Sequence, residues 1–251
     1  MTRFPRILLF ALLLAASLPV CAAGPTGLLN DTGQNTCDNW DTYGYHDSST
    51  MVACATANSG NAAAYPRQDG RFGRDAAAAA GVLVKIGAGT NGFDYTKICM
   101  SGNAEGTGTC PSNPTANTTP APAATEWACT KDNVTNLVWS LDSPINKYTW
   151  TYATTTYPAT INATNRCGYS TGWRLPTRRE LLSIAHSGLT AYEPNIDSAY
   201  FPGPTDNHYW SADSYTLYAP DYAWAVYFYD GSANYYSKTY SYYVRLVRSG
   251  P

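Results

Sequence analysis

The chain has 251 residues, with 16 Lys and Arg against 18 Asp and Glu, 14% charged residues and 44% hydrophobic residues. So few charges beside so many apolar residues exclude a disordered chain, and a net charge of −2 excludes a generally basic nucleic-acid-binding protein. Twenty-one Tyr, seven Trp, 20 Gly and 16 Pro are typical of a turn-rich, mostly β protein.

The first 23 residues have the features of a cleaved export signal. Arg3 and Arg6 precede an apolar run at 7–18, which is shorter than the roughly 20 residues that cross a bilayer. Small residues near position 23 offer a cleavage site, and a lipoprotein acylated at Cys21 is the alternative. We therefore expect an exported protein, without a membrane span in its mature form. Cleavage leaves 14 basic against 18 acidic residues, a net charge of −4.

Cleavage also leaves six cysteines, an even number that in an exported chain indicates disulfide bonds. No Cys-x-x-Cys occurs and the three His are widely spaced, which favours disulfides over a metal site. Several pairings are open, and pairing in chain order is the simplest. The predicted bonds are Cys37–Cys54, Cys99–Cys110 and Cys129–Cys167.

Residues 24–125 are rich in Gly, Ala, Asn and Thr and poor in aromatic residues. Within them, residues 111–125 contain several Pro and no hydrophobe larger than Ala, which predicts a linker or exposed loop. We interpret 24–125 as a loop-rich N-terminal extension of one domain, with a separate domain as the alternative.

One short helix is expected in this extension, from about Gly73 to Lys85. Alanine has the highest helix propensity, and Asp75 suits the positive N-terminus of a helix. Val82, Leu83 and Ile86 are expected to seat the helix on a core.

Residues 126–251 have a sharper pattern. Thr177 and Glu180 form a capping box ahead of apolar residues, which predicts a helix from 178 to about 187. Asp230-Gly231 is a hairpin turn signal between two strand-like segments. The predicted strands are 136–141, 209–212, 222–229 and 243–248. The pattern indicates an α+β domain of antiparallel strands with one main helix.

Several blocks in this part carry a resemblance to a known family. They are the segment Gly172–Ser183 around Arg-Leu-Pro-Thr, Tyr209-Trp210-Ser211, Tyr243–Arg248 and an opening block at Cys129–Trp139, in which Asn136 stands where Gly is usual. In their order along the chain, beginning with the opening block, they resemble the Lcl C-terminal domain family, long catalogued as a domain of unknown function and named after a bacterial collagen-like adhesin. The resemblance covers about 126–248, roughly half of the chain.

The resemblance implies a bacterial protein with a C-type-lectin-like fold. It implies binding of sulfated polysaccharides such as glycosaminoglycans, and assembly as a homotrimer, because these are properties of the namesake module. Most family members have no established activity, so the fold is carried over more directly than the function.

Four Arg lie close together in the sequence: Arg166, Arg174, Arg178 and Arg179. The planar fork of arginine suits bidentate contact with sulfate or carboxylate, so this group is the best candidate for a polyanion-binding patch. Arg174 is expected to make an internal ion pair instead. Arg178 and Arg179 occupy the first helical turn, where the helix dipole disfavours cations, which hints at use on the surface. In the last predicted strand, Arg245 and Arg248 are expected to be structural.

Aromatic residues offer a second means of sugar contact. Thirteen Tyr fall between positions 192 and 243, and most are expected to pack in the sheet with wet hydroxyl groups. The set expected to be most exposed is Tyr215, Tyr218, Tyr222, Tyr235 and Tyr236, whereas the core is expected to hold Trp139, Trp173, Trp210 and Trp224.

Metal and enzyme chemistry find little support. Glu193-Pro194-Asn195 matches a calcium-dependent sugar-binding motif of mannose-type lectins, but it follows the helix directly and no Trp-Asn-Asp follows it. No Gly-x-Ser-x-Gly elbow occurs, and no Cys follows Cys167 for a formylglycine-type oxidase. We expect no metal, no cofactor and no catalytic residues.

The sequence therefore predicts an exported, non-enzymatic binding module or adhesin, periplasmic or at the surface of a bacterium. The favoured ligand is anionic or sulfated polysaccharide, and the candidate ligand-binding residues are Arg178, Arg179, Lys238, Tyr218 and Tyr235. A mature net charge of −4 requires that this patch be local. The alternative is a module that binds another envelope protein or assembles with itself. No nucleic-acid partner is expected.

Overall fold

The computed structural model describes residues 36–38, 51–53, 73–142, 147–188, 194–203, 207–218 and 220–251. For residues 36–38, 51–53 and 218 it describes the backbone alone. The predicted signal peptide, Cys21 and Glu193 lie outside these residues. The predicted Cys37–Cys54 bond and the Tyr218 side chain also fall outside what the structure describes.

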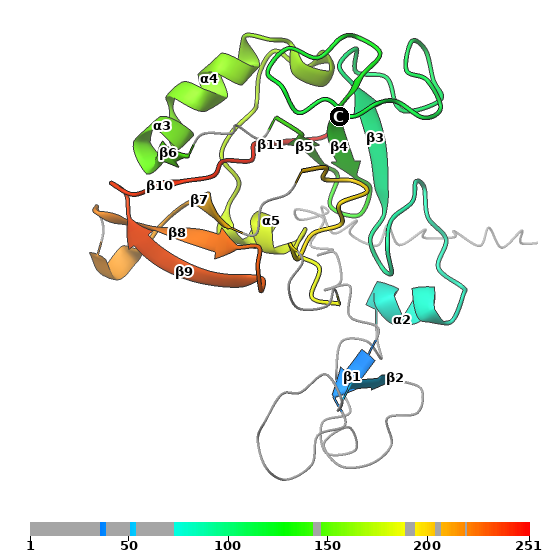
Figure 1. Ribbon diagram of the computed structural model, residues 1–251, viewed down its shortest axis with the longest axis horizontal. Coiled ribbons are helices and arrows are strands. Elements are labelled where there is room, and N and C mark those ends of the chain that lie inside the picture. Colours follow the sequence, from blue (N-terminus) through cyan, green and yellow to red (C-terminus); the bar gives the residue numbers. More distant parts are fainter. Residues whose placement is uncertain are drawn as a thin grey trace, which may run out of the picture.

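Antiparallel strands build most of the described chain (Figure 1). The strands are β1 (Thr36–Asp38), β2 (Met51–Ala53), β3 (Tyr95–Cys99), β4 (Trp127–Asp132), β5 (Leu137–Ser140), β6 (Tyr148–Thr149), β7 (His208–Ser214), β8 (Tyr222–Tyr227), β9 (Ser232–Ser237), β10 (Ser241–Tyr242) and β11 (Val247–Ser249). One sheet has the order β11-β5-β4-β3 and another the order β7-β8-β9, while β10 pairs with β6 and β1 with β2.

The helices are short. They are α2 (Gly73–Ala79), α3 (Trp150–Thr154), α4 (Thr156–Asn162) and α5 (Arg178–Leu182), with 3₁₀ turns η2 (Arg166–Gly168) and η3 (Thr216–Tyr218). Mixed α and β structure with mostly antiparallel strands confirms the predicted α+β class at this level. Helices α3 and α4 were not predicted.

Helices cover both faces of the three-stranded sheet. Ala223 and Ala225 of β8 share a buried cluster with residues of α3 and α4, and Val226 lies in a second cluster with Leu181 of α5. Because successive strand residues point to opposite faces, α3–α4 and α5 pack on opposite sides of this sheet. Trp210 of β7 belongs to the first cluster and is fully buried.

Three of the four predicted strands are found, as β5, β7 and β8, but the turn after β8 and the segment at 243–248 differ from expectation. The Asp230-Gly231 turn connects β8 to β9, a strand that was not predicted, rather than to the last strand. The segment predicted as one strand at 243–248 follows β10, which pairs with β6, and runs into β11, which pairs with β5. Val244, Arg245 and Leu246, which precede β11, are buried, so the buried segment begins ahead of the paired strand.

The β4–β5 turn explains the departure from the family pattern. Asn136 has φ of 56°, a left-handed conformation that Gly adopts freely and that Asn tolerates better than most residues. The Asn at this position is therefore compatible with the same turn.

Helix α2 ends earlier than predicted. Gly81 has φ of 71°, its amide donates to the Ala78 carbonyl, and the Val82 amide donates to the Ala77 carbonyl. These two bonds are those of a Schellman motif, which terminates a helix at a glycine. The expectation that Val82 and Ile86 seat the helix on a core was wrong, because they are 69% and 82% exposed.

The predicted extension shares a sheet with the rest of the fold. Strand β3 pairs with β4 across the predicted boundary at 125/126. Residues 111–125 form a loop that is tied to its surroundings, since the Asn117 amide donates to the Trp127 carbonyl and Arg166 donates to the Thr119 carbonyl.

Two disulfides were predicted correctly. Cys99–Cys110 closes a short loop after β3, and Cys129–Cys167 joins β4 to η2, with Cα–Cα distances of 5.6 and 6.3 Å. All four cysteines are buried, so both bonds lie within packed regions.

Candidate functional site

Helix α5 positions Arg178. The Thr177 side chain accepts a hydrogen bond from the Glu180 amide, and the Glu180 carboxylate accepts one from the Thr177 amide, so the predicted capping box is present. The Arg178 amide donates to Asp213 Oδ2 at 2.6 Å, which joins the start of α5 to the end of β7. The guanidinium carbon of Arg178 lies 4.1 Å from the centre of the Trp224 ring. The next residue, Arg179, is exposed.

Lys238 lies at the C-terminal end of β7, on the side of the sheet opposite to Arg178. Its Nζ is 4.1 Å from the centre of the Trp150 ring in α3 and donates to Ser214 Oγ at 2.9 Å. Because Asp213 and Ser214 are adjacent, the structure brings Arg178 and Lys238 to opposite sides of the C-terminal end of β7. Sequence spacing alone gave no sign of this proximity.

Tyrosines surround the Trp224 ring. Tyr235 stacks on Tyr215 with ring centres 3.9 Å apart, and both rings meet Trp224 edge-on at 5.9 and 5.4 Å. The tyrosines expected to be most exposed are half-buried where their side chains are described. We call the following residues the cation–aromatic surface: Arg178, Arg179, Lys238, Trp150, Trp224, Tyr215 and Tyr235.

Trp224 was predicted to lie in the core and is instead half-buried, unlike Trp139, Trp173 and Trp210. Trp150 was not singled out from the sequence. A signal for Trp224 was present, because it alternates with Ala223 and Ala225, so that one face of β8 carries the bulky side chain.

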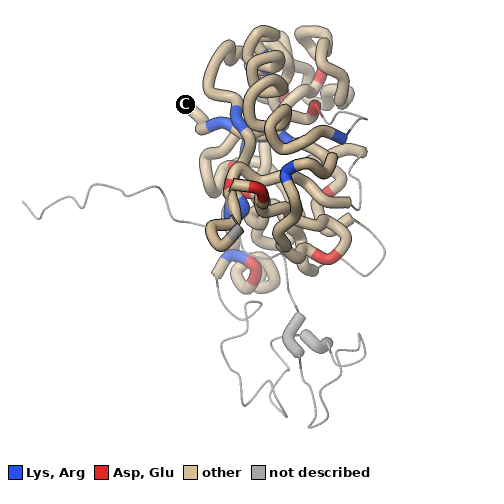
Figure 2. Tube along the Cα trace, turned by 90° about the vertical axis from the view of Figure 1, so that its left-hand side faces the viewer, with Lys and Arg blue, Asp and Glu red and all other residues tan. Residues whose placement is uncertain are grey.

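In the part of the chain that the structure describes, aromatic rings accompany more cations than carboxylates do. Among the described residues the ion pairs are Arg74–Asp94 at 3.6 Å and Arg174–Glu180 at 2.6 Å. Cations that lie over aromatic rings are Lys97, Lys147, Arg178, Lys238, Arg245 and Arg248. No carboxylate of the described chain lies within ion-pair distance of Arg178, Arg179 or Lys238. Figure 2 shows Lys and Arg dispersed over the trace.

The other candidate arginines are structural. Arg174 makes the predicted ion pair, donating to both oxygens of Glu180, but the pair is not internal, because the Arg174 side chain is 43% exposed. Burial alone would raise the pKa of Glu180, but the hydrogen bonds from Arg174 and Thr177 hold that pKa below its usual value. Arg166 and Arg245 are buried, so neither belongs to an exposed patch.

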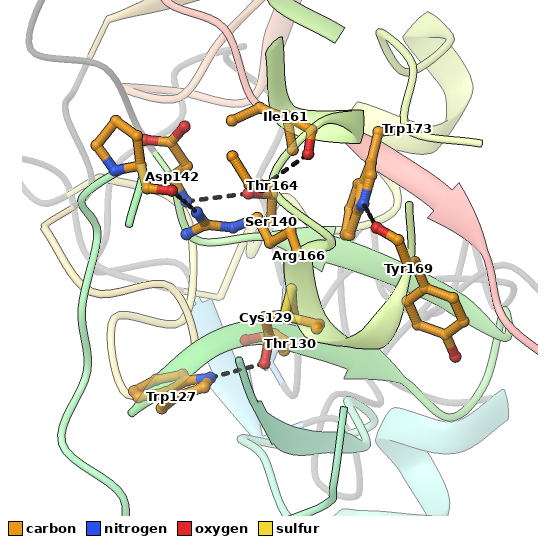
Figure 3. The surroundings of a disulfide bond; sticks show 12 residues. Trp127, Cys129, Thr130, Ser140, Asp142, Ile161, Thr164, Arg166, Tyr169 and Trp173 are labelled. Atoms are coloured by element: carbon orange, nitrogen blue, oxygen red, sulfur yellow. Dashed lines mark hydrogen bonds between the residues drawn. A yellow bond between two sulfur atoms is a disulfide. The ribbon is translucent and has the colours of Figure 1, made fainter. Parts of the chain in front are cut away.

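Arg166 lies beside the Cys129–Cys167 bond (Figure 3). Its Nη1 donates to the Thr119 carbonyl, and Tyr157 donates to the nearby Asp142 at 2.6 Å. Burial lowers the pKa of Arg166 and raises that of Asp142. This polar group lies within the fold, where it joins the 111–125 loop to η2.

Other chemistry is sparse. The described residues contain no group of three or more His, Cys, Asp or Glu that could hold a metal ion. In the same part of the chain, no helix is long and apolar enough to cross a membrane. Asn195, from the motif considered for calcium, is buried, and its backbone bonds His186 and Phe228.

His186 gives the protein a predicted pH dependence. The ring is buried against Phe93, its Nδ1 accepts from the Gly188 amide, and burial lowers its pKa below 6.5. The unfolded chain therefore takes up a proton first as the pH falls through 6.5, so the free energy of unfolding should fall below that pH, by at most about 1.4 kcal/mol per pH unit for this group.

Urea unfolding between pH 7.5 and 5 measures this effect. The His186→Asn variant keeps an acceptor near the Nδ1 position and removes the titration, so its stability should depend less on pH than that of the unmodified chain. Burial lowers the pKa of His208 too, so some pH dependence should persist. Equal slopes for variant and parent would contradict the assignment.

Comparison with known families identifies the C-terminal half. Residues 128–248 match the family model of the Lcl C-terminal domain. The chain carries an Lcl C-terminal domain. This confirms the resemblance found in the sequence, and the matched residues include β4 except Trp127, all of β5 and the cation–aromatic surface. A search of the curated proteins finds no match to the chain.

Proposed function

We propose that this chain is an exported, non-enzymatic binding protein of a bacterium, whose Lcl C-terminal domain recognises anionic polysaccharide at the cell surface. We include in the proposal the C-type-lectin-like fold that the family implies. The observation that carries the function is the pair of cations, Arg178 and Lys238, held over tryptophan rings without a carboxylate partner among the described residues.

A cation over a ring keeps its charge available. The face of the ring attracts the cation without neutralising it, whereas a carboxylate would cancel its charge. Arginine also keeps N–H donors at the edge of its guanidinium plane, where sulfate or carboxylate oxygens accept them in pairs. Arg178 and Lys238 are thus positioned by rings, and neither belongs to an ion pair within the described residues.

The arrangement suits an extended ligand. Arg178 and Lys238 contact adjacent residues at the end of β7, from opposite sides of the sheet, and the exposed Arg179 of α5 adds a third cation. In this proposal a polysaccharide with repeated negative groups contacts all three cations. In this proposal Tyr235 acts chiefly through Tyr215 and Trp224, because its ring is stacked on Tyr215.

A panel of polysaccharides tests the proposal. The mature chain would be presented with a sulfated polysaccharide, its desulfated counterpart, a carboxylated one and a neutral one, at low and physiological salt and with EDTA. We expect the sulfated form to bind best, with affinity that falls as salt rises and no effect of EDTA. Equal binding to sulfated and desulfated forms would contradict the role of the cations. No binding to any of the polysaccharides would favour the alternative, a module that binds another envelope protein or assembles with itself.

A further inference from the structure

An exposed apolar strip follows helix α2. Of the seven large hydrophobic side chains that the described residues expose, three lie within five positions: Val82, Val84 and Ile86, which are 69%, 87% and 82% exposed. Leu83 and Lys85 between them are half-buried. Exposure that alternates with every residue is the pattern of an extended chain with one apolar face. In Figure 1 this part of the chain, between α2 and β3, lies at the periphery of the fold.

The strip is held at both ends. The Schellman bonds at Gly81 fix its start, and the amides of Ile86 and Gly87 both donate to the Asp94 carboxylate at 2.8 Å. Between these anchors, the amides of Val84 and Lys85 make no hydrogen bond to the described chain. An extended segment with free backbone groups and exposed β-branched side chains is a template for pairing with another strand.

The sequence of the strip reads nearly the same in both directions. Residues 80–88 are Ala-Gly-Val-Leu-Val-Lys-Ile-Gly-Ala, which is symmetric about Val84 in residue size and type, except that Leu83 corresponds to Lys85. In an antiparallel pair of identical segments centred on Val84, Val82 faces Ile86 and Lys85 faces Leu83. No two lysines are then directly opposed, and like charges that face each other would destabilise the pair.

We propose that residues 82–86 form an interface with the same residues of a second copy, paired antiparallel about a two-fold axis through Val84. A two-fold interface requires a surface that is complementary to itself, and the palindromic strip has that property. Three apolar side chains per copy bury less than a standard interface, so the dimer is weak and forms at high local concentration. The interface is separate from the cation–aromatic surface, and the inference does not depend on the ligand.

Cysteine cross-linking in the mature chain tests the pairing and its register. Directly opposed residues in antiparallel strands have Cα atoms about 4.5–5.5 Å apart, within disulfide range. Val84→Cys should therefore form a disulfide-linked dimer on mild oxidation. Val82→Cys alone should not, because its two copies would lie about 14 Å apart along the strands, four residues at about 3.4 Å each. Mixing Val82→Cys with Ile86→Cys should restore the dimer.

Leu217→Cys is the matched control, since Leu217 is an exposed apolar residue elsewhere, 77% exposed. Cross-linking of Val84→Cys no faster than that of Leu217→Cys would overturn the proposal, as would equal cross-linking of Val82→Cys alone. Sedimentation gives an independent readout: Val84→Lys should abolish concentration-dependent dimers, whereas Leu217→Lys should retain them. A trimer that is unaffected by Val84→Lys would also overturn it.

Discussion

Replacing Cys129 and Cys167 with Ala is expected to lower the free energy of unfolding by about 4 kcal/mol. The bond joins residues separated by 38 positions, so its loss frees a long loop in the unfolded chain. Both sulfurs also belong to the buried cluster that contains Trp210. The loss should therefore include packing as well as chain entropy.

The second disulfide provides the comparison. Cys99–Cys110 spans 11 positions, so removing it should cost about 3 kcal/mol, less than removing Cys129–Cys167. Urea unfolding of both double-alanine variants measures the order. Equal losses, or a larger loss for Cys99–Cys110, would contradict the view that β4–η2 is the more important link.

Trp210→Ala is expected to cost about 3–5 kcal/mol, the range for a large aromatic side chain removed from a core. The Trp210 side chain of β7 is fully buried in the cluster that also holds Ala153 of α3, and its Nε1 donates to the Tyr148 carbonyl of β6 at 2.9 Å. The variant loses packing and leaves that carbonyl without its partner. Trp210→Phe should cost less, because it keeps part of the volume.

Urea unfolding with the disulfides intact measures these losses. Leu217→Ala is the control, since the side chain is 77% exposed and its removal should change stability by no more than about 0.5 kcal/mol. A loss below about 1 kcal/mol for Trp210→Ala would show that the first core cluster is not the main source of stability.

Local signals in the sequence predicted those parts of the fold that local chemistry determines. The capping box at Thr177 and Glu180 requires only residues three apart, and the structure contains it. The Asp230-Gly231 turn was also predicted from the sequence, and the structure contains it between β8 and β9. Its strand partner was not, because β9 consists mostly of polar and tyrosine residues that do not form a clear apolar run.

Helices α3 and α4 show where local propensity fails. Their residues are rich in Thr and Tyr, which favour strands, and Pro158 stands in the first turn of α4, where proline is tolerated. The helical signal is the four-residue spacing of the buried Ala153, Tyr157 and Ile161. Tertiary packing on this stripe outweighs propensity.

The sequence analysis named the cations of the candidate site, but it did not identify the aromatic rings that contact them. Arg178, Arg179 and Lys238 were singled out by residue type, but the rings beneath two of them come from distant elements. Trp150 lies in a helix that was not predicted, and Trp224 was assigned to the core. The contact between a side chain and a distant ring depends on strand pairing, which residue type does not encode.

The most direct test of the account is the affinity of the mature chain for a sulfated polysaccharide, measured at low and physiological salt for the parent and three variants. Arg178→Ala/Arg179→Ala should weaken binding roughly tenfold, about 1.4 kcal/mol, and make it less sensitive to salt. Lys238→Ala should weaken it in the same direction. Lys131→Ala removes one cation from β4, which belongs to a different sheet from the strands that carry the cation–aromatic surface. This variant should leave the affinity unchanged. Equal weakening by Lys131→Ala, or none by the Arg178/Arg179 variant, would contradict a polyanion site at the end of β7.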